Sequence, residues 1–374
     1  MRKPKNWNQP CPNKNCDLYG QVNKGNISSR ATYMSKSGKR RVFHCSNCNT
    51  NFSETRDTVF FDLRTEEKVI MMALKMILVK VGLTDITFVL GVKEETLLNW
   101  LDRAAKKAKE INTALLKNLP VTEVQLDEMW SYVKRKVSQS AVNENESPQD
   151  VEDGRQWVWV SYAPEFRLIL AIVVGPRTFE TALTLIQMTA GMVLGVPCFF
   201  SDGFSCYYRA LIECYHEIKI FPKTGKRGRP KDPVKEPHPQ LVYGQIVKEK
   251  EKGKLIKITY RIRCGAERLK KTGLKIGTSL LERLNLTIRH ALSPLTRKTL
   301  GFSKKRANLR KQTTLFQAFY NVARPHMSLR EKINDTDDLF VQKWVERTPG
   351  MAASITDHVW TFRELLTAKF CNDP

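Results

Sequence analysis

Long apolar segments are missing from this sequence of 374 residues. No stretch resembles the apolar core of a signal peptide or reaches the roughly 18 residues that span a membrane as a helix. Internal repeats with a period of about 20 to 50 residues are also missing, which excludes repeat architectures. We therefore expect a globular cytoplasmic protein that has no membrane partner and is long enough for several domains.

Acidic residues are scarce relative to basic ones. The chain has 62 Lys and Arg against 38 Asp and Glu, a net charge of +24, while 41% of its residues are hydrophobic. Residues 221–275 contain 17 basic and 5 acidic side chains, and residues 289–312 contain eight basic and no acidic ones. One such tract is explained by a solvated surface, but two dense tracts predict a protein that binds nucleic acid.

The cysteine count of nine is odd. In a chain expected to occupy a reducing compartment, grouped cysteines indicate metal ligands before disulfides. Cys11 and Cys16 form one close pair, and Cys45 and Cys48 form another after an interval of 28 residues. Two close pairs can supply four thiolates to one tetrahedral ion, so we predict a zinc ribbon with structural Zn²⁺ over residues 1–60. Four free buried thiols are the alternative.

Residues 61–118 show the periodicity of helices. Apolar side chains recur at steps of three and four after residue 65, and a short second helix is expected over residues 85–90. Gly91 allows a turn before a third helix, an order typical of a helix-turn-helix DNA reader. A three-helix bundle without a DNA partner has the same pattern. The polar positions expected to face a DNA groove are Lys93, Glu94, Thr96, Asn99 and Arg103.

Strand and helix patterns alternate in the next part of the chain. The expected strands are residues 121–135, 157–162, 168–174, 198–201 and 217–221. The expected helices are residues 178–193 and 204–214. The first three strands form an antiparallel meander, with a polar acidic loop at 136–154, and the whole order matches a ribonuclease-H-like α/β architecture. A basic insertion at 222–265 ends in a predicted hairpin.

Three acidic residues occupy positions that this architecture can bring together. Asp127 and Asp202 end apolar strand-like runs, and Glu282 lies in a helical pattern. Clustered carboxylates can bind two divalent ions about 3.5–4 Å apart, which suits in-line phosphoryl transfer. Strand alternation sends Glu128 to the face opposite Asp127, so we expect Glu128 to contribute less to such a site.

Other interpretations of these acids stay open at this point. Asp202 precedes Gly203 and could simply cap a turn. Glu282, Asn285 and Arg289 share one helical face, so Glu282 and Arg289 could be an exposed ion pair. In a catalytic site, the same face would direct the carboxylate to the metals and Arg289 to a phosphate.

Several motifs together resemble one protein family. They are Leu126-Asp127-Glu128-Met129-Trp130-Ser131-Tyr132-Val133, Ser201-Asp202-Gly203 with Tyr207-Tyr208-Arg209-Ala210-Leu211, Leu281-Glu282-Arg283-Leu284-Asn285-Leu286-Thr287-Ile288-Arg289, and Arg324-Pro325-His326. From Cys11 to about Leu329 the chain resembles transposases of the bacterial insertion-sequence-one type. The resemblance implies that Asp127, Asp202 and Glu282 are the DDE ligands of Mg²⁺ or Mn²⁺, and that Arg289 is the basic residue after the Glu.

The resemblance also implies a multidomain α/β fold. The expected parts are a zinc ribbon at 1–60, a helix-turn-helix at 61–118, a ribonuclease-H-like catalytic domain at 119–335 with the insertion 222–265, and a helical tail at 336–374. Such a protein would be a nucleoid-associated DNA transposase that binds terminal inverted repeats and target DNA as a homo-oligomer on paired ends. A DNA-binding regulator and a structure-specific nuclease are the alternatives. The expected DNA-binding residues are Lys93, Thr96, Asn99, Arg103, Lys223, Lys226, Arg227, Arg229, Arg297, Lys298, Lys304 and Lys305.

Overall fold

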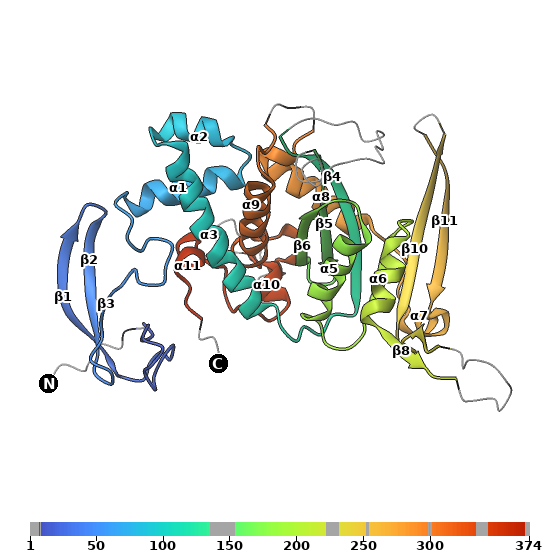
Figure 1. Ribbon diagram of the computed structural model, residues 1–374, viewed down its shortest axis with the longest axis horizontal. Coiled ribbons are helices and arrows are strands. Elements are labelled where there is room, and N and C mark those ends of the chain that lie inside the picture. Colours follow the sequence, from blue (N-terminus) through green and yellow to red (C-terminus); the bar gives the residue numbers. More distant parts are fainter. Residues whose placement is uncertain are drawn as a thin grey trace.

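A computed structural model describes residues 7, 9–134, 154–221, 232–251, 254–297, 299, 301–333 and 343–370. Across the molecule, a small N-terminal sheet is followed by a helical region, a large sheet and a projecting β-hairpin (Figure 1). None of the described helices has both the length and the apolar character needed to cross a membrane.

The N-terminal sheet is antiparallel and has the strand order β1-β2-β3. Its strands are β1 (Ile27–Ser35), β2 (Gly38–Cys45) and β3 (Asn51–Ser53). Its apolar core is small and consists of Ile27, Phe43 and Phe52 packed with cysteines. Because so little apolar surface is buried here, a bound ion would add substantially to the stability of this part.

Three helices follow. They are α1 (Glu67–Leu78), α2 (Leu83–Leu90) and α3 (Glu94–Leu115). Gly91 ends α2 with φ of 63°, a left-handed conformation that costs glycine little, and so permits the predicted turn. The buried face of α3 carries Leu97, Trp100 and Leu101 and packs against α9 (Arg306–Ala318) and α11 (Phe362–Thr367).

The large sheet has six strands in the order β11-β10-β7-β4-β5-β6. Their bounds are β4 (Glu123–Tyr132), β5 (Arg155–Ala163), β6 (Leu168–Gly175), β7 (Cys198–Asp202), β10 (Val242–Glu251) and β11 (Lys254–Cys264). β4, β5 and β6 form the predicted antiparallel meander, and β7 lies parallel to both β4 and β10. This mixed sheet fits the predicted ribonuclease-H-like architecture.

The strand expected at residues 217–221 is present as β8 (His216–Lys219), but its expected place in the large sheet is wrong. Among the described residues, β8 pairs with β9 (Val234–Pro237) in a separate two-stranded sheet. β10 lies beside β7 instead. The physical reason is burial: Val242 and Tyr243 are fully buried, as a central strand requires, whereas most of β8 is exposed.

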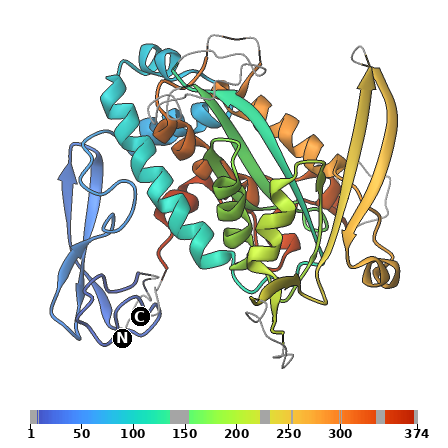
Figure 2. The same cartoon turned by 45° about the vertical axis from the view of Figure 1, so that its right-hand side comes forward.

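Helices cover both faces of the large sheet (Figures 1 and 2). On one face, α5 (Phe179–Ala190) and α6 (Cys206–Cys214) share a core with residues of β4 to β7. On the other face, α8 (Ser279–Ala291) and α9 share a second core with β4, β5 and β6. This second core continues into α1, α3 and α11, so the helical region and the sheet are packed as one body.

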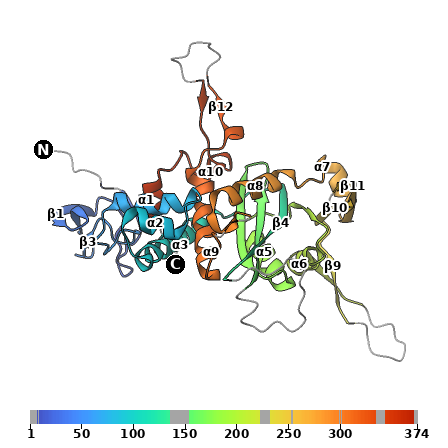
Figure 3. The ribbon, with the colours of Figure 1, turned by 90° about the horizontal axis from the view of Figure 1, so that it is seen from above.

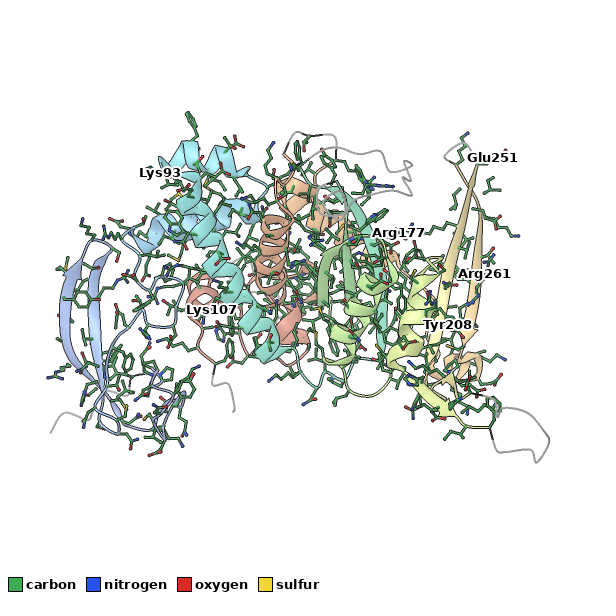
Figure 4. The ribbon with its side chains drawn as sticks, viewed as in Figure 1. Lys93, Lys107, Arg177, Tyr208, Glu251 and Arg261 are labelled. Atoms are coloured by element: carbon green, nitrogen blue, oxygen red, sulfur yellow. The ribbon has the colours of Figure 1, made fainter. Side chains whose placement is uncertain are left out.

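The β10–β11 hairpin projects beyond the rest of the sheet (Figure 2). Glu251 lies near its tip, and Arg261 lies on the outer strand (Figure 4). The remaining elements are α7 (Ala266–Thr272), η1 (Ser293–Leu295), the π-helical η2 (Phe319–Ala323), η3 (Met327–Leu329), β12 (Glu331–Lys332), β13 (Trp344–Val345) and α10 (Pro349–Ala352). β12 projects on its own side of the molecule, away from the large sheet (Figure 3).

Candidate active site and metal centres

Asp127 and Asp202 lie side by side because their strands are parallel neighbours. Leu126 of β4 is paired with Ser201 of β7, so the next residue on each strand is an aspartate. Asp202 ends β7, and its Oδ1 accepts a 3.0 Å hydrogen bond from the Phe204 N–H. Asp202 therefore caps a turn, as the simpler interpretation predicted, and at the same time belongs to a carboxylate group.

Glu128 belongs to that group as well. Carboxylate oxygens of Asp127, Glu128 and Asp202 all lie within 4.8 Å of one another. The predicted alternation holds, since Glu128 contacts Tyr207 of α6 whereas Asp127 contacts Asn285 of α8. The inference that alternation would keep Glu128 apart is wrong, because Asp202 lies at a strand end where both faces of β4 are within reach.

Arg177, which is partly exposed, and the buried Tyr207 hold Glu128 in place. Its Oε1 accepts hydrogen bonds from Arg177 Nε at 2.9 Å and Nη2 at 2.5 Å, and its Oε2 accepts one of 2.8 Å from the Tyr207 hydroxyl. The Arg177 guanidinium lies over the Trp157 ring at 4.9 Å and the Phe204 ring at 4.3 Å. The Glu128 side chain is only 1% exposed, so its position is tightly defined.

Crowding of these carboxylates makes their ionisation unfavourable. Burial, followed by repulsion from Glu128 and Asp202, raises the pKa of Asp127 to about 7. Burial and repulsion from Asp202 raise the pKa of Glu128 to about 7 despite its contact with Arg177. A divalent cation among these oxygens would offset the repulsion.

Helix α8 brings further polar groups to the same place. Gln125 Oε1 accepts a 3.0 Å bond from the Leu281 N–H, which fixes the start of α8 on β4. Asn285 Nδ2 donates a 2.6 Å bond to Asp127 Oδ2. Within the described chain, the buried Asn285 Oδ1 then has no hydrogen-bond partner. An unpartnered buried oxygen beside carboxylates is a candidate cation ligand.

Glu282 lies one helical turn before Asn285 but outside the group of three carboxylates. Its Oε1 accepts hydrogen bonds from Lys248 Nζ of β10 and, at 3.1 Å, from Thr278 Oγ1. The Glu282 side chain is 49% exposed, and its charge contributes to the raised pKa of Asp127. Glu282 therefore faces the site, while a lysine occupies one of its oxygens.

Arg289, one turn beyond Asn285, is tied to the backbone. Its Nη1 and Nη2 donate to the carbonyl groups of Leu295 at 3.0 Å and Trp130 at 3.2 Å. Burial lowers the pKa of the guanidinium to about 10, so Arg289 stays charged at neutral pH. These bonds link α8, η1 and β4 around a cleft of about 1040 Å³. We call it the carboxylate cleft; its lining includes Asp127, Glu128, Glu282, Asn285 and Arg289.

The residues of the carboxylate cleft fit a hard divalent cation. All candidate ligand atoms are oxygens, from Asp127, Glu128, Asp202 and the amide of Asn285. Oxygen-only donor sets suit Mg²⁺ and Mn²⁺ rather than softer metals. Such an ion would offset the repulsion that helps to raise the pKa values of Asp127 and Glu128, and it would give the amide oxygen of Asn285 a partner.

Four cysteines form a second candidate metal centre in the N-terminal sheet. The Sγ atoms of Cys11, Cys16, Cys45 and Cys48 all lie within 4.8 Å of one another. Cys11 and Cys48 are separated by 3.6 Å, and Cys16 and Cys45 by 4.0 Å. Four thiolates about 2.3 Å from one tetrahedral Zn²⁺ are about 3.8 Å apart, so the group matches that ion. The wide spacing of the first pair does not prevent convergence.

Side-chain donors surround the sulfur atoms. Asn26 Nδ2 donates to Cys45 Sγ at 3.2 Å, and Asn47 Nδ2 donates to Cys16 Sγ at 3.3 Å. Such donors stabilise thiolate ligands of a metal. Burial raises the pKa of the Cys11 thiol, whereas hydrogen bonding with Thr50 lowers that of Cys48 to about 6.

The positions expected to contact DNA have mixed environments. Lys93 and Asn99 are exposed near the start of α3, and Thr96 is half-buried (Figure 4 shows Lys93). Arg103 is half-buried, because its Nη1 donates a 2.6 Å bond to the Phe61 carbonyl. DNA contact by this helix stays a prediction. Arg297, Lys304 and Lys305 are exposed. Lys223, Lys226, Arg227, Arg229 and Lys298 lie outside the described residues.

His326 is not part of the lining of the carboxylate cleft. Its Nδ1 accepts a 3.3 Å bond from the Ser328 N–H and caps η3, while its ring packs edge-on against Tyr320. These contacts give His326 a structural role.

Comparisons with known proteins give weak structural matches. No protein-family model matches the sequence, and no curated protein matches it either. The Mos1 transposase paired-end complex with left transposon end matches at 13% identity and a TM-score of 0.16, over 39% of this chain and 55% of that one. The Mos1 strand transfer complex matches at 14% identity and a TM-score of 0.17, over 39% and 54%.

A Mos1 mariner paired-end complex with Mn matches at 13% identity and a TM-score of 0.17, over 36% of this chain and 51% of that one. The chain therefore matches about half the length of these transposase chains. Because identity and TM-score are both low, function is inferred below from the residues of this chain.

Proposed function

We propose that this protein is a DDE transposase, a metal-dependent polynucleotidyl transferase that cleaves DNA and joins the freed end to a target. The observation that carries the proposal is the convergence of Asp127 and Glu128, in the middle of β4, with Asp202 at the end of the neighbouring strand β7. The amide oxygen of Asn285, which has no hydrogen-bond partner among the described residues, and the carboxylate of Glu282 offer further oxygen ligands in the same cleft. Buried carboxylates with raised pKa values, grouped in a cleft, favour a functional site over a structural ion pair.

The ligand roles follow from these positions. Asp127 and Asp202 would hold two Mg²⁺ or Mn²⁺ ions, and Glu282 would complete one coordination sphere after leaving Lys248. Glu128 would act as a neighbouring carboxylate that Arg177 and Tyr207 hold at a fixed distance. When bound, the ions supply electrostatic stabilisation of an in-line displacement and a more reactive attacking oxygen.

The reaction consists of two displacements at phosphorus. In cleavage, a water oxygen bonds to phosphorus as the bond to a 3′ oxygen breaks, which frees a 3′-hydroxyl. In strand transfer, that hydroxyl bonds to a target phosphorus and displaces another 3′ oxygen, while its proton passes to solvent. The guanidinium of Arg289 and the exposed side chain of Arg297 line the cleft and offer positive charge to the phosphates.

DNA recognition would lie in the N-terminal half. The α2–Gly91–α3 segment would form the helix-turn-helix that reads the terminal inverted repeats, with Lys93, Thr96 and Asn99 at the exposed start of α3. Zn²⁺ held by the four cysteines would stabilise the preceding ribbon. Two protomers would pair two DNA ends before strand transfer.

Cleavage and strand transfer of DNA that carries the sequences flanking the gene test the proposal. Full-length protein with Mg²⁺ or Mn²⁺ is expected to nick labelled end duplexes and insert them into a plasmid, and Ca²⁺ is expected not to support either step. Asp127→Asn, Asp202→Asn and Glu282→Gln should abolish both steps and leave binding intact. Cleavage without insertion would identify a nuclease instead, and binding without cleavage would identify a regulator.

A further inference from the structure

Three aromatic rings form one side of the carboxylate cleft, and we call them the aromatic wall: Trp130, Tyr132 and Phe302. The ring centroids of Trp130 and Tyr132 are 5.5 Å apart, and those of Tyr132 and Phe302 are 5.2 Å apart. All three side chains are half-buried. Within the described chain, none of them belongs to an apolar core.

The backbone holds this wall in position. Trp130 and Tyr132 are two residues apart on β4, so both project from the same face. Val133 and Ser303 form an isolated bridge, and the Lys134 N–H donates a 2.9 Å bond to the Ser303 carbonyl, which fixes Phe302 beside β4. An ordered set of half-buried rings that lines a cleft and belongs to no apolar core of the described chain is available to a ligand.

The surrounding charges indicate what that ligand is. Lys304 Nζ lies 4.4 Å from the Phe302 ring centroid, and Arg289 and Arg297 line the same cleft. Asp127 and Glu128 lie in the middle of β4, and Tyr132 is its last residue. A ligand that offers a flat ring to the wall and a phosphate to the cations is a nucleotide.

We propose that the aromatic wall binds one unpaired nucleobase of the DNA strand whose phosphate lies at the carboxylates. The base must be unpaired because bases inside a duplex expose edges rather than faces. This assignment rests on the proposed function, since it names the form of DNA that the catalytic cleft takes.

Fluorescence of 2-aminopurine tests the assignment. Full-length protein in EDTA is titrated with two duplexes that differ only in whether a 2-aminopurine near one end is paired or unpaired. The unpaired probe is expected to be quenched and bound more tightly. Trp130→Leu and Phe302→Leu should each weaken binding of the unpaired probe by about 5- to 150-fold and leave the paired probe nearly unaffected, as expected for loss of one stacked base.

Two controls separate stacking from folding. Trp130→Phe keeps an aromatic face and should retain most of the preference. Trp344→Leu removes a ring outside the cleft, where Arg330 lies over it, and should change neither probe. If Trp130→Leu lowers the unfolding temperature strongly, Phe302→Leu, on a loop, carries the comparison.

The outcomes also distinguish this inference from the proposed function. Equal affinity and fluorescence for both probes, with DNA cleavage intact, would overturn the base site alone. Loss of all DNA binding and cleavage in the wild type would overturn both. A Trp130→Leu variant that changes the sedimentation of the free protein but not probe binding would show that the wall contacts a second protein chain.

Discussion

Asn285 Nδ2 donates a 2.6 Å hydrogen bond to Asp127 Oδ2, and this contact joins the middle of α8 to β4. The bond fixes the orientation of the amide, because the opposite orientation would place its oxygen against a carboxylate. Asn285 Oδ1 is therefore left buried and unpartnered within the described residues. This hydrogen bond thus holds the Asp127 carboxylate in place and leaves the amide oxygen of Asn285 free to bind a cation.

Asn285→Leu should weaken divalent-ion binding. The substitution removes a donor to Asp127 and a neutral oxygen, and a hydrogen bond to a charged group contributes about 1.5–3 kcal/mol. We expect the Kd for Mn²⁺, measured by calorimetry, to rise about tenfold or more. Asn285→Asp adds a carboxylate and should bind Mn²⁺ at least as tightly as the wild type, and equal weakening by both substitutions would contradict a ligand role.

Asp127 should make the metal-free protein less stable as the pH rises. The pKa of Asp127 is about 7 in the folded chain and lower in the unfolded chain. Its contribution to the free energy of unfolding is therefore full below about pH 4 and is lost as the pH passes 7. This loss of stability has an upper bound of roughly 4 kcal/mol. Urea unfolding in EDTA should show Asp127→Asn more stable than the wild type at pH 8, with the difference narrowing by pH 5. A difference in unfolding free energy between Asp127→Asn and the wild type that is the same at pH 5 and pH 8 would refute the raised pKa of Asp127.

Glu128→Gln should reduce cleavage by at least about tenfold, a barrier increase of roughly 1.4 kcal/mol. The alternation of side chains along β4, taken alone, predicted a smaller loss of DNA cleavage. The stronger effect is expected because the Glu128 carboxylate lies with Asp127 and Asp202. Tyr207→Phe, which removes only one hydrogen bond to Glu128, serves as the control and should retain most activity. Full activity in Glu128→Gln would restrict the site to the three acids of the sequence prediction.

Lys248→Gln should tighten Mg²⁺ binding. Lys248 pairs with Glu282, and its removal frees that carboxylate and lowers the local positive charge. The gain should stay below about fivefold, because exposed ion pairs contribute at most about 1 kcal/mol. Lys219→Gln breaks a comparable surface pair with Glu236 and should leave Mg²⁺ affinity unchanged. Weaker Mg²⁺ binding in Lys248→Gln would show that the two side chains do not compete.

Cys45→Ser should release zinc from the full-length protein. The Cys45 thiolate is one of four ligands, and zinc binding contributes directly to folding of small ribbons. Elemental analysis is expected to find one zinc per wild-type chain and less in the variant, with faster proteolysis before residue 60. Cys206→Ser changes a cysteine of α6 outside the cluster and should keep the metal. A wild-type chain without zinc would end this assignment.

Local patterns in the sequence were sufficient for the elements that depend on short-range physics. The two cysteine pairs, the helical periods of α1 and α3, and the strands β4 to β7 were all predictable, because spacing fixes which side chains share a face. Asp202 ends β7 as expected, whereas the expectation that Asp127 ends its strand-like run is wrong, because β4 continues to Tyr132.

The tertiary structure decided the rest. The entry of β10 rather than β8 into the large sheet, the inclusion of Glu128 and the Lys248–Glu282 pair all depend on which strands become neighbours. The aromatic wall likewise joins β4 to a loop about 170 residues later, a separation over which spacing carries no information. Side-chain direction is set locally, whereas the partner at the end of a side chain is set by long-range packing.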